Sequence, residues 1–160
     1  MIDLKKIVHQ NLYDIANLSV AEEQKHFITS NTDSIMQAYV AITNHGVALP
    51  FGIYDDDTPV GFIMFGYTPK DSIELPEVTR GNYCLWRIMI DQRYQNKGYG
   101  KAALEMGIAY IKQLAMGTSQ YCWLCYQPEN EVTVQLCRSI GFHNCGEKYN
   151  NKNIALLPLR

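Results

Sequence analysis

The sequence predicts an α/β protein in which residues 1–160 form one domain around a mixed, mostly antiparallel sheet with helices on both faces. Segments with the apolar runs or alternation of strands lie between segments in which apolar residues recur at the helical period. Their order is one strand, helices, three strands, a helix, a strand, a helix and two strands, which is typical of a sheet covered on both sides. A chain of 160 residues can bury about 70% of its unfolded surface, so it can fold without metals or disulfides.

The first third of the chain combines one short strand with helical segments. An apolar alternation predicts a strand at 4–8, and apolar residues at helical spacing predict helices at 11–18, 21–29 and 32–43. Thr32 has a hydroxyl of the kind that caps helix N-termini, so we expect it to begin the third helix.

Two strands follow, at 48–54 and 59–67. Between them stands Asp55-Asp56-Asp57-Thr58, a run of residues that favour tight turns. The pattern therefore predicts a β-hairpin.

The second half of the chain alternates strands and helices after a proline-containing loop at 68–80. Glycines after the helical patterns indicate where the helices end. Asn150-Asn151 has the residue types of a tight turn, which predicts a closing hairpin. The expected elements are a strand at 82–91, a helix at 99–116 ended by Gly117, a strand at 120–126, a helix at 129–140 ended by Gly141, and strands at 142–149 and 154–157.

A loop with two glycines precedes the expected helix at 99–116. Gly98 and Gly100 lack a Cβ, so they can take positive φ and let a ligand approach the backbone. The first turn of a helix leaves N–H groups unpaired, and the helix dipole adds partial positive charge. Three cations add to that charge: Arg93, Lys97 and Lys101. The loop therefore predicts a site for a phosphate or diphosphate group.

Other interpretations of this loop exist. A P-loop would need Ser or Thr after Lys101, where the chain has Ala102, so that alternative fails. The run Gly98-Tyr-Gly100-Lys-Ala-Ala103 does fit the dinucleotide pattern, which leaves a nicotinamide or flavin oxidoreductase open. The seven residues 91–97 separate the pattern from its strand, which weakens that alternative. A glycine-relaxed turn without any ligand also stays open.

Charge and hydropathy argue against two classes of partner. A formal charge of -2 with no basic run argues against a nucleic-acid-binding protein. No stretch approaches the roughly 18 apolar residues of a membrane helix, and no apolar segment resembles a secretory signal. We therefore expect a cytoplasmic protein with no nucleic-acid or membrane partner.

The cysteines predict free thiols, because their number is odd and no secretory signal is evident. Cys122 and Cys125 are spaced like a zinc-binding pair, with His143 and Cys145 as conceivable partners. Positions three apart on a strand face opposite sides, however, so we expect no metal site.

Two motifs resemble the GNAT superfamily of acyl-CoA-dependent N-acetyltransferases. The segment 87–104 is similar to the family's central motif, Gln/Arg-x-x-Gly-x-Gly/Ala, and the segment 129–142 is similar to its closing helix and strand. Both stand in the family's order, and the element order of the whole chain matches as well. The stretches Leu18-Ser-Val-x-x-x-Gln24-x-x-Phe27 and Tyr94-Gln95-x-Lys97-Gly98 look most like bacterial spermidine/spermine or diamine acetyltransferases.

The resemblance implies a GNAT-like fold and acetyl-CoA as co-substrate. Ile88, Met89 and Ile90 would offer backbone groups to the pantetheine arm, because their strand splays from the strand at 120–126. Asn130 would hydrogen-bond the pantetheine or a neighbouring backbone group. The diphosphate would lie on backbone N–H groups of Gln95, Asn96, Lys97, Gly98, Tyr99, Gly100 and Lys101.

It also implies direct transfer of acetyl from the thioester to a small-molecule amine. An ammonium of pKa about 10.4 must lose a proton before it attacks, so we expect acids at the acceptor site, with Glu22 or Glu23 as bases. Many family members have Tyr where this chain has Cys137. Its thiol could protonate the departing thiolate, or could simply pack in the core.

Two further expectations stay open. A non-catalytic acyl-CoA-binding regulatory protein is the alternative to an enzyme, because Cys137 replaces the usual Tyr and Trp86 stands where polyamine acetylators often have an acid. A homodimer through the C-terminal strands is a further expectation.

Overall fold

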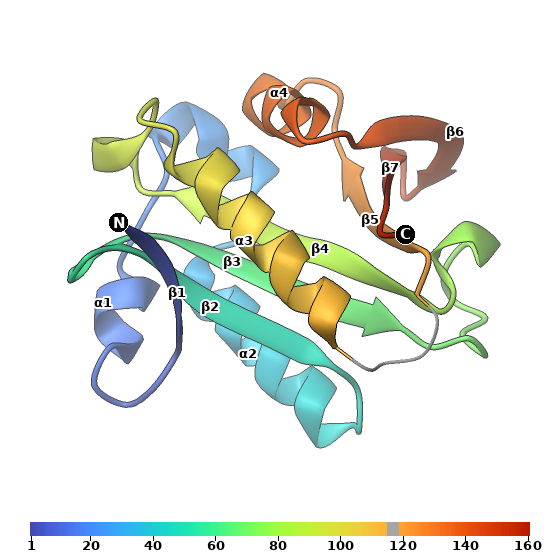
Figure 1. The fold of residues 1–160 in the computed structure, drawn as a ribbon, viewed down its shortest axis with the longest axis horizontal. Coiled ribbons are helices and arrows are strands. Elements are labelled where there is room, and N and C mark those ends of the chain that lie inside the picture. The colour runs from blue at the N-terminus through green and yellow to red at the C-terminus, as the bar shows by residue number, and fades with distance from the viewer. Residues whose placement is uncertain (115–118) are drawn as a thin grey trace.

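The computed structural model describes residues 1–114 and 119–160 and confirms the sheet with helices on both faces (Figure 1). Seven strands stand in the order β1-β2-β3-β4-β5-β7-β6. Only β4 and β5 run parallel, and the other neighbours are antiparallel. The strands are β1 (Ile2–Lys6), β2 (Ala48–Asp55), β3 (Thr58–Thr68), β4 (Asn82–Ile90), β5 (Tyr121–Tyr126), β6 (His143–Tyr149) and β7 (Lys152–Pro158).

Four α-helices in the described part of the chain cover the two faces of this sheet. In Figure 1, α3 and α4 lie on one side of the sheet, and α1 and α2 lie on the other. Their bounds are α1 (Leu12–Ala16), α2 (Asn31–Thr43), α3 (Tyr99–Gln113) and α4 (Glu131–Ser139). None of the helices in residues 1–114 and 119–160 has the length and apolar character that crossing a membrane requires.

The N-terminal helical segments differ from the sequence prediction. The segment expected as a helix at 21–29 forms a 3-10 helix, Glu22–Phe27. The N-cap of the third helix lies two residues earlier than expected, at Ser30 and not at Thr32. The Ser30 hydroxyl accepts a hydrogen bond from the Asp33 backbone N–H at 3.1 Å, which satisfies one of the free donors of the first turn.

Several boundaries also shift. The first strand spans Ile2–Lys6 and not 4–8, since its register pairs Ile2 with Asp55 of β2. The expected loop at 68–80 contains a 3-10 turn, Glu77–Thr79. The helix expected at 99–116 ends at Gln113, and the expected stop at Gly117 lies outside the described residues.

Both predicted hairpins are confirmed. β2 and β3 pair through Asp55↔Thr58, and β6 and β7 pair through Tyr149↔Lys152. Asn150 and Asn151 both have positive φ, as two-residue hairpin turns favour. The order of strands places β6 at the edge of the sheet. The homodimer through the C-terminal strands stays a prediction.

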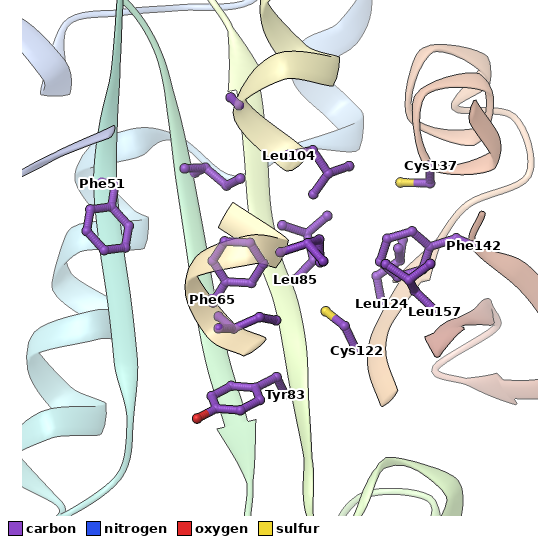
Figure 2. Close-up of a cluster of buried hydrophobic side chains, with 14 of the residues drawn as sticks. Phe51, Phe65, Tyr83, Leu85, Leu104, Cys122, Leu124, Cys137, Phe142 and Leu157 are labelled. Carbon is purple, nitrogen blue, oxygen red and sulfur yellow. The ribbon is translucent and has the colours of Figure 1, made fainter. Parts of the chain in front are cut away.

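Buried side chains on both faces fix β3 and β4 in place. Figure 2 shows the larger cluster, in which Phe65 and Leu85 of the sheet meet Leu104 of α3. On the opposite face, Phe62 and Met89 pack with residues of α1 and α2. Burying each such side chain stabilises the fold by about 1.5–3 kcal/mol. The position of β4 is therefore set from both sides.

Candidate active site

β4 and β5 separate after a short parallel contact. They pair only at Tyr83↔Cys122 and Cys84↔Trp123, whereas β4 stays paired with β3 as far as Ile90. Beyond that contact, no strand of the described residues lies beside this edge of β4. This confirms the predicted splay, which leaves backbone groups near Ile88 and Met89 free of a β5 partner.

The loop after β4 ends at a helix without a side-chain cap. Gly98 is the N-cap of α3, with φ +84, and no side chain accepts a hydrogen bond from the first turn. Gly98 takes the positive φ that is open to glycine, whereas Gly100 lies inside the helix and does not. A Cβ on Gly100 would contact Leu136 Cδ2 at 3.4 Å, whereas a Cβ on Gly98 would meet no atom within 4 Å. The space over Gly98 is open to a ligand.

A cavity of about 250 Å³ joins this loop to the open edge of β4. It contacts every residue predicted to bind the coenzyme except Lys97, namely Ile88, Met89, Ile90, Gln95, Asn96, Gly98, Tyr99, Gly100, Lys101 and Asn130. Lys97 stands outside, with its Nζ 5.9 Å from the centroid of the Tyr94 ring.

The opposite wall of this cavity was not predicted. Gln24 and Phe27 contribute from the 3-10 helix, and Leu136 contributes from α4. The Gln95 Nε2 group donates to Gln24 Oε1 and to the Ile90 carbonyl, both at 2.9 Å. The side chain of Gln95 thus ties the loop to this wall, and only its backbone N–H is left for an anion.

Asp91, the first residue of the loop after β4, was also not predicted to be important for the site. Its side chain links this loop to the N-terminal segment. Its carboxylate is 3% exposed and accepts hydrogen bonds from Ser19 N–H at 3.0 Å, Arg93 N–H at 3.0 Å and Arg93 Nε at 2.8 Å. Burial alone would raise the pKa of Asp91, but the Arg93 side chain and the two backbone donors outweigh it and lower the pKa. Asp91 therefore stands ionised as an anchor between β4 and the N-terminal segment.

Asn130 caps α4. Its Oδ1 accepts from the Thr133 backbone N–H at 3.4 Å, and its Nδ2 donates to Thr133 Oγ1 at 2.9 Å. The cap orients the side chain at the cavity, and a hydrogen bond from it to the coenzyme stays a prediction.

A second cavity of about 540 Å³ opens on the other side of the β4 edge. It shares lining residues with the first cavity, which places the two next to each other: Phe27, Ile28, Ile88, Asn130 and Thr133. Its wall is rich in aromatic side chains, Tyr67, Trp86, Trp123, Tyr126 and Tyr149. A small molecule in this cavity would meet a coenzyme in the first cavity at the shared residues.

The charges of the second cavity differ from those expected. Its wall includes the cations Arg87 and Lys152, and no described lining residue is Asp or Glu. The lining of this cavity therefore adds no support to the expectation of acids around the acceptor, which stays a prediction.

Glu22 and Glu23 contact neither cavity. Glu22 Oε1 forms an ion pair with Lys25 Nζ at 2.6 Å, on the surface. Their assignment as bases stays a prediction to which this geometry adds no support.

Cys137 lies in the core. Its side chain is 4% exposed, and Figure 2 shows the sulfur among side chains of the larger cluster. Desolvation raises the pKa of this thiol to about 12. Its neighbour Leu136 lines the first cavity, but Cys137 lines neither. This position favours the packing role over the acid role.

No group of three or more metal-binding side chains lies together within residues 1–114 and 119–160. Cys122 is buried in the larger core cluster, and Cys125 lies on the wall of the second cavity.

Comparison with known proteins identifies the family. The sequence model described as acetyltransferase (GNAT) family matches residues 12–142. The spermine/spermidine N(1)-acetyltransferase of Bacillus subtilis (strain 168) is 28% identical over 159 residues, which is 99% of each chain.

Two solved structures share the fold. The spermidine N-acetyltransferase of Vibrio cholerae, in complex with CoA and spermine, aligns with a TM-score of 0.68 and 16% identity over 99% of this chain and 95% of that chain. The PaiA N-acetyltransferase of Thermoplasma acidophilum, in complex with coenzyme A, aligns with a TM-score of 0.68 and 17% identity over 99% of each chain.

These matches remove the reason for the dinucleotide alternative, since the residues matched by the family model include the glycine loop. With the family model extending over most of its length, the chain belongs to the acetyltransferase (GNAT) family and is an acetyltransferase.

Proposed function

We propose that this chain transfers the acetyl group of acetyl-CoA directly to the primary amine of a small molecule. The observation that carries the proposal is the first cavity, in which the open edge of β4 continues into the uncapped start of α3. The second cavity, adjoining it at Ile88 and Asn130, offers room for the amine.

The first cavity suits the coenzyme for three physical reasons. Backbone N–H groups at the start of α3 are free to bind a diphosphate, and Lys101 adds positive charge beside them. The unpaired edge of β4 can hydrogen-bond an extended pantetheine arm as an added strand would. The missing Cβ of Gly98 leaves space for the phosphates.

The transfer needs a neutral amine. Its nitrogen forms a bond to the thioester carbonyl carbon, the C–S bond breaks with its electron pair on sulfur, and one proton leaves the nitrogen for solvent or the departing thiolate. A backbone N–H of Met89 or Ile90 would donate to the developing oxyanion. We assign no step to Cys137, since its thiol is buried away from both cavities.

We expect the rate to rise with pH. With no carboxylate on the described wall of the second cavity, deprotonation depends on solvent and on the neighbouring cations, which lower the pKa of a bound ammonium. For an amine of pKa about 10, the neutral fraction grows roughly tenfold per pH unit below that value. kcat/KM should therefore increase about tenfold from pH 7 to pH 8. A plateau with a midpoint near pH 6 to 7 would instead reveal a base side chain.

The acceptor amine is tested with a panel. The curated name of the Bacillus subtilis relative makes spermidine and spermine the first polyamines to include, with putrescine, small aromatic amines and amino acids beside them. Mass spectrometry of the acetylated product and chromatography of released CoA measure turnover. Tight binding of acetyl-CoA without turnover of any amine would contradict an enzyme and favour a regulatory acyl-CoA-binding protein.

Cys137 gives a separate prediction. Cys137→Ala should lower the free energy of unfolding by about 1–2 kcal/mol through a small core cavity and leave kcat within twofold. Cys137→Ser is the matched control, because it keeps the size and adds a buried hydroxyl. A fall in kcat of tenfold or more in both variants, with their folds intact, would restore the thiol as the acid.

A further inference from the structure

Among the described residues, the Arg87 side chain hydrogen-bonds only to uncharged groups and forms no ion pair. Its Nη1 donates to the Trp86 carbonyl at 2.8 Å, and its Nη2 donates to Thr29 Oγ1 at 3.0 Å and Gln37 Oε1 at 3.1 Å. These acceptors are all neutral. The Nε atom is buried and has no partner among the described residues. Burial lowers the pKa of the guanidinium because no carboxylate offsets its desolvation.

A β-bulge puts this cation on the cavity wall. In the β3–β4 ladder, Met64 pairs with Arg87 and Phe65 pairs with Leu85, so Trp86 is an extra residue of β4. Leu85 and Ile88 are three residues apart, and in a regular strand they would face opposite sides of the sheet. Both pack in the cluster beneath α3, because the bulge puts them on the same side. The opposite face of β4 therefore carries Trp86 and Arg87 side by side toward the second cavity.

Lys152 contributes a second positive charge from β7 on the other wall of the same cavity. The salt bridges of the described residues include neither Arg87 nor Lys152. The described wall of the second cavity thus carries two cations and no acid, and the Nε–H group of Arg87 has no acceptor there. The electrostatic potential in this cavity is therefore positive. Such a site repels a polycation and attracts an anion.

We infer that the acceptor amine of this enzyme carries an anionic group, of which a carboxylate is the simplest, and that Arg87 and Lys152 bind that group in the second cavity. The inference rests on the proposed acetyl transfer and names its substrate class. It sets this chain apart from relatives named for spermine and spermidine, because a polyamine brings further positive charges into a cavity that already holds two.

The aromatic wall adds to this specificity. A carboxylate held at Arg87 would leave the remainder of the acceptor among faces such as Trp123, Tyr126 and Tyr149. These suit an apolar or aromatic side chain better than a chain of ammonium groups that lacks acidic partners. An aromatic amino acid therefore combines the features of the site.

The wild-type enzyme tests the inference with matched acceptors. Tyrosine is compared with tyrosinamide, in which an uncharged amide replaces the carboxylate, and ornithine is compared with putrescine, which lacks the carboxylate. Each kcat/KM is divided by the neutral fraction of the acceptor amine at the assay pH, because an amide lowers the pKa of the neighbouring amine. We expect kcat/KM to be at least tenfold higher for the carboxylate-bearing member of each pair. Equal values, or a preference for putrescine and spermidine, would overturn the inference while leaving acetyl transfer intact. Failure of every amine would instead count against the proposed function itself.

Substitution of Arg87 then tests whether the preference for a carboxylate arises in the second cavity. Arg87→Met should reduce the tyrosine-to-tyrosinamide ratio at least fivefold, and Arg87→Gln should do the same if the methionine variant is poorly folded. Lys112→Met removes one exposed charge from the end of α3, away from both cavities, and should leave the ratio unchanged. Calorimetry with CoA completes the test. If the tyrosine-to-tyrosinamide ratio did not change in the Arg87 variants, Arg87 would not bind the acceptor's anionic group. The same conclusion would follow if the variants bound CoA more weakly and the ratio stayed the same.

Discussion

Replacing Gly98 with Asp is expected to weaken CoA binding at least tenfold more than replacing it with Asn. The two side chains are close to isosteric, and both tolerate the left-handed conformation that φ +84 imposes. That φ strains both variants to a similar extent, and in neither would the added Cβ meet an atom within 4 Å. The variants therefore differ by one negative charge at the start of α3. Two unit charges about 5 Å apart repel by roughly 1.7 kcal/mol at an effective dielectric constant of about 40, which exceeds one factor of ten in affinity.

Isothermal calorimetry with CoA measures this difference, and circular dichroism verifies that both variants are folded. Raising the salt concentration from about 0.05 to 0.5 M should reduce the gap between Asp and Asn, because mobile ions screen the repulsion. Equal affinity of the two variants at low salt would place the diphosphate somewhere other than this loop and would remove the main support for the first cavity as the coenzyme site.

The local parts of the fold could be predicted because short-range chemistry decides them. The hairpin at Asn150-Asn151 follows from side chains that accept positive φ, and the start of α3 follows from Gly98. The segment Glu22–Phe27 was harder, since its sequence suits an α-helix. It forms a 3-10 helix whose side chains contact the loop after β4 through Gln24 and Gln95, which are 71 residues apart.

Most residues of the first cavity could be predicted for the same reason, because they are nearly contiguous in the chain. The wall of the second cavity could not be predicted. Arg87 meets Thr29 across 58 residues, and its place on the wall depends on a bulge that the sequence does not mark. Acidic residues are plentiful in the sequence, but no local pattern tells which of them face the second cavity. The expectation that Glu22 or Glu23 would serve as the base rested on the chemical need for a proton acceptor and on their place in the expected helix at 21–29.

Asp91→Asn is expected to lower the free energy of unfolding by about 3 kcal/mol at pH 7. The carboxylate accepts from donors on both oxygens, and an amide can accept on only one of them. With the amide oxygen toward Arg93, its NH2 group would face the Ser19 N–H, leaving a buried donor unpaired and the loop after β4 loosely held. Breaking a buried charged network of this kind costs about 3–5 kcal/mol in other proteins, and the partial exposure of Arg93 places this one at the lower end.

Urea denaturation at several pH values measures the loss. Because the pKa of Asp91 is lowered in the folded state, its contribution is complete above the unfolded-state value of 3.8 and disappears as the pH falls through the folded-state value. The stability gap between wild type and Asp91→Asn should therefore be constant from pH 5 to 7 and shrink below pH 4. Arg93→Gln is the matched control. It keeps both backbone donors and removes only a side chain that is 63% exposed, so it should cost less than about 1 kcal/mol. If the two variants lost the same free energy of unfolding, the stabilisation would come from the surface ion pair with Arg93. The buried hydrogen bond from Ser19 would then contribute nothing to holding the cavity wall.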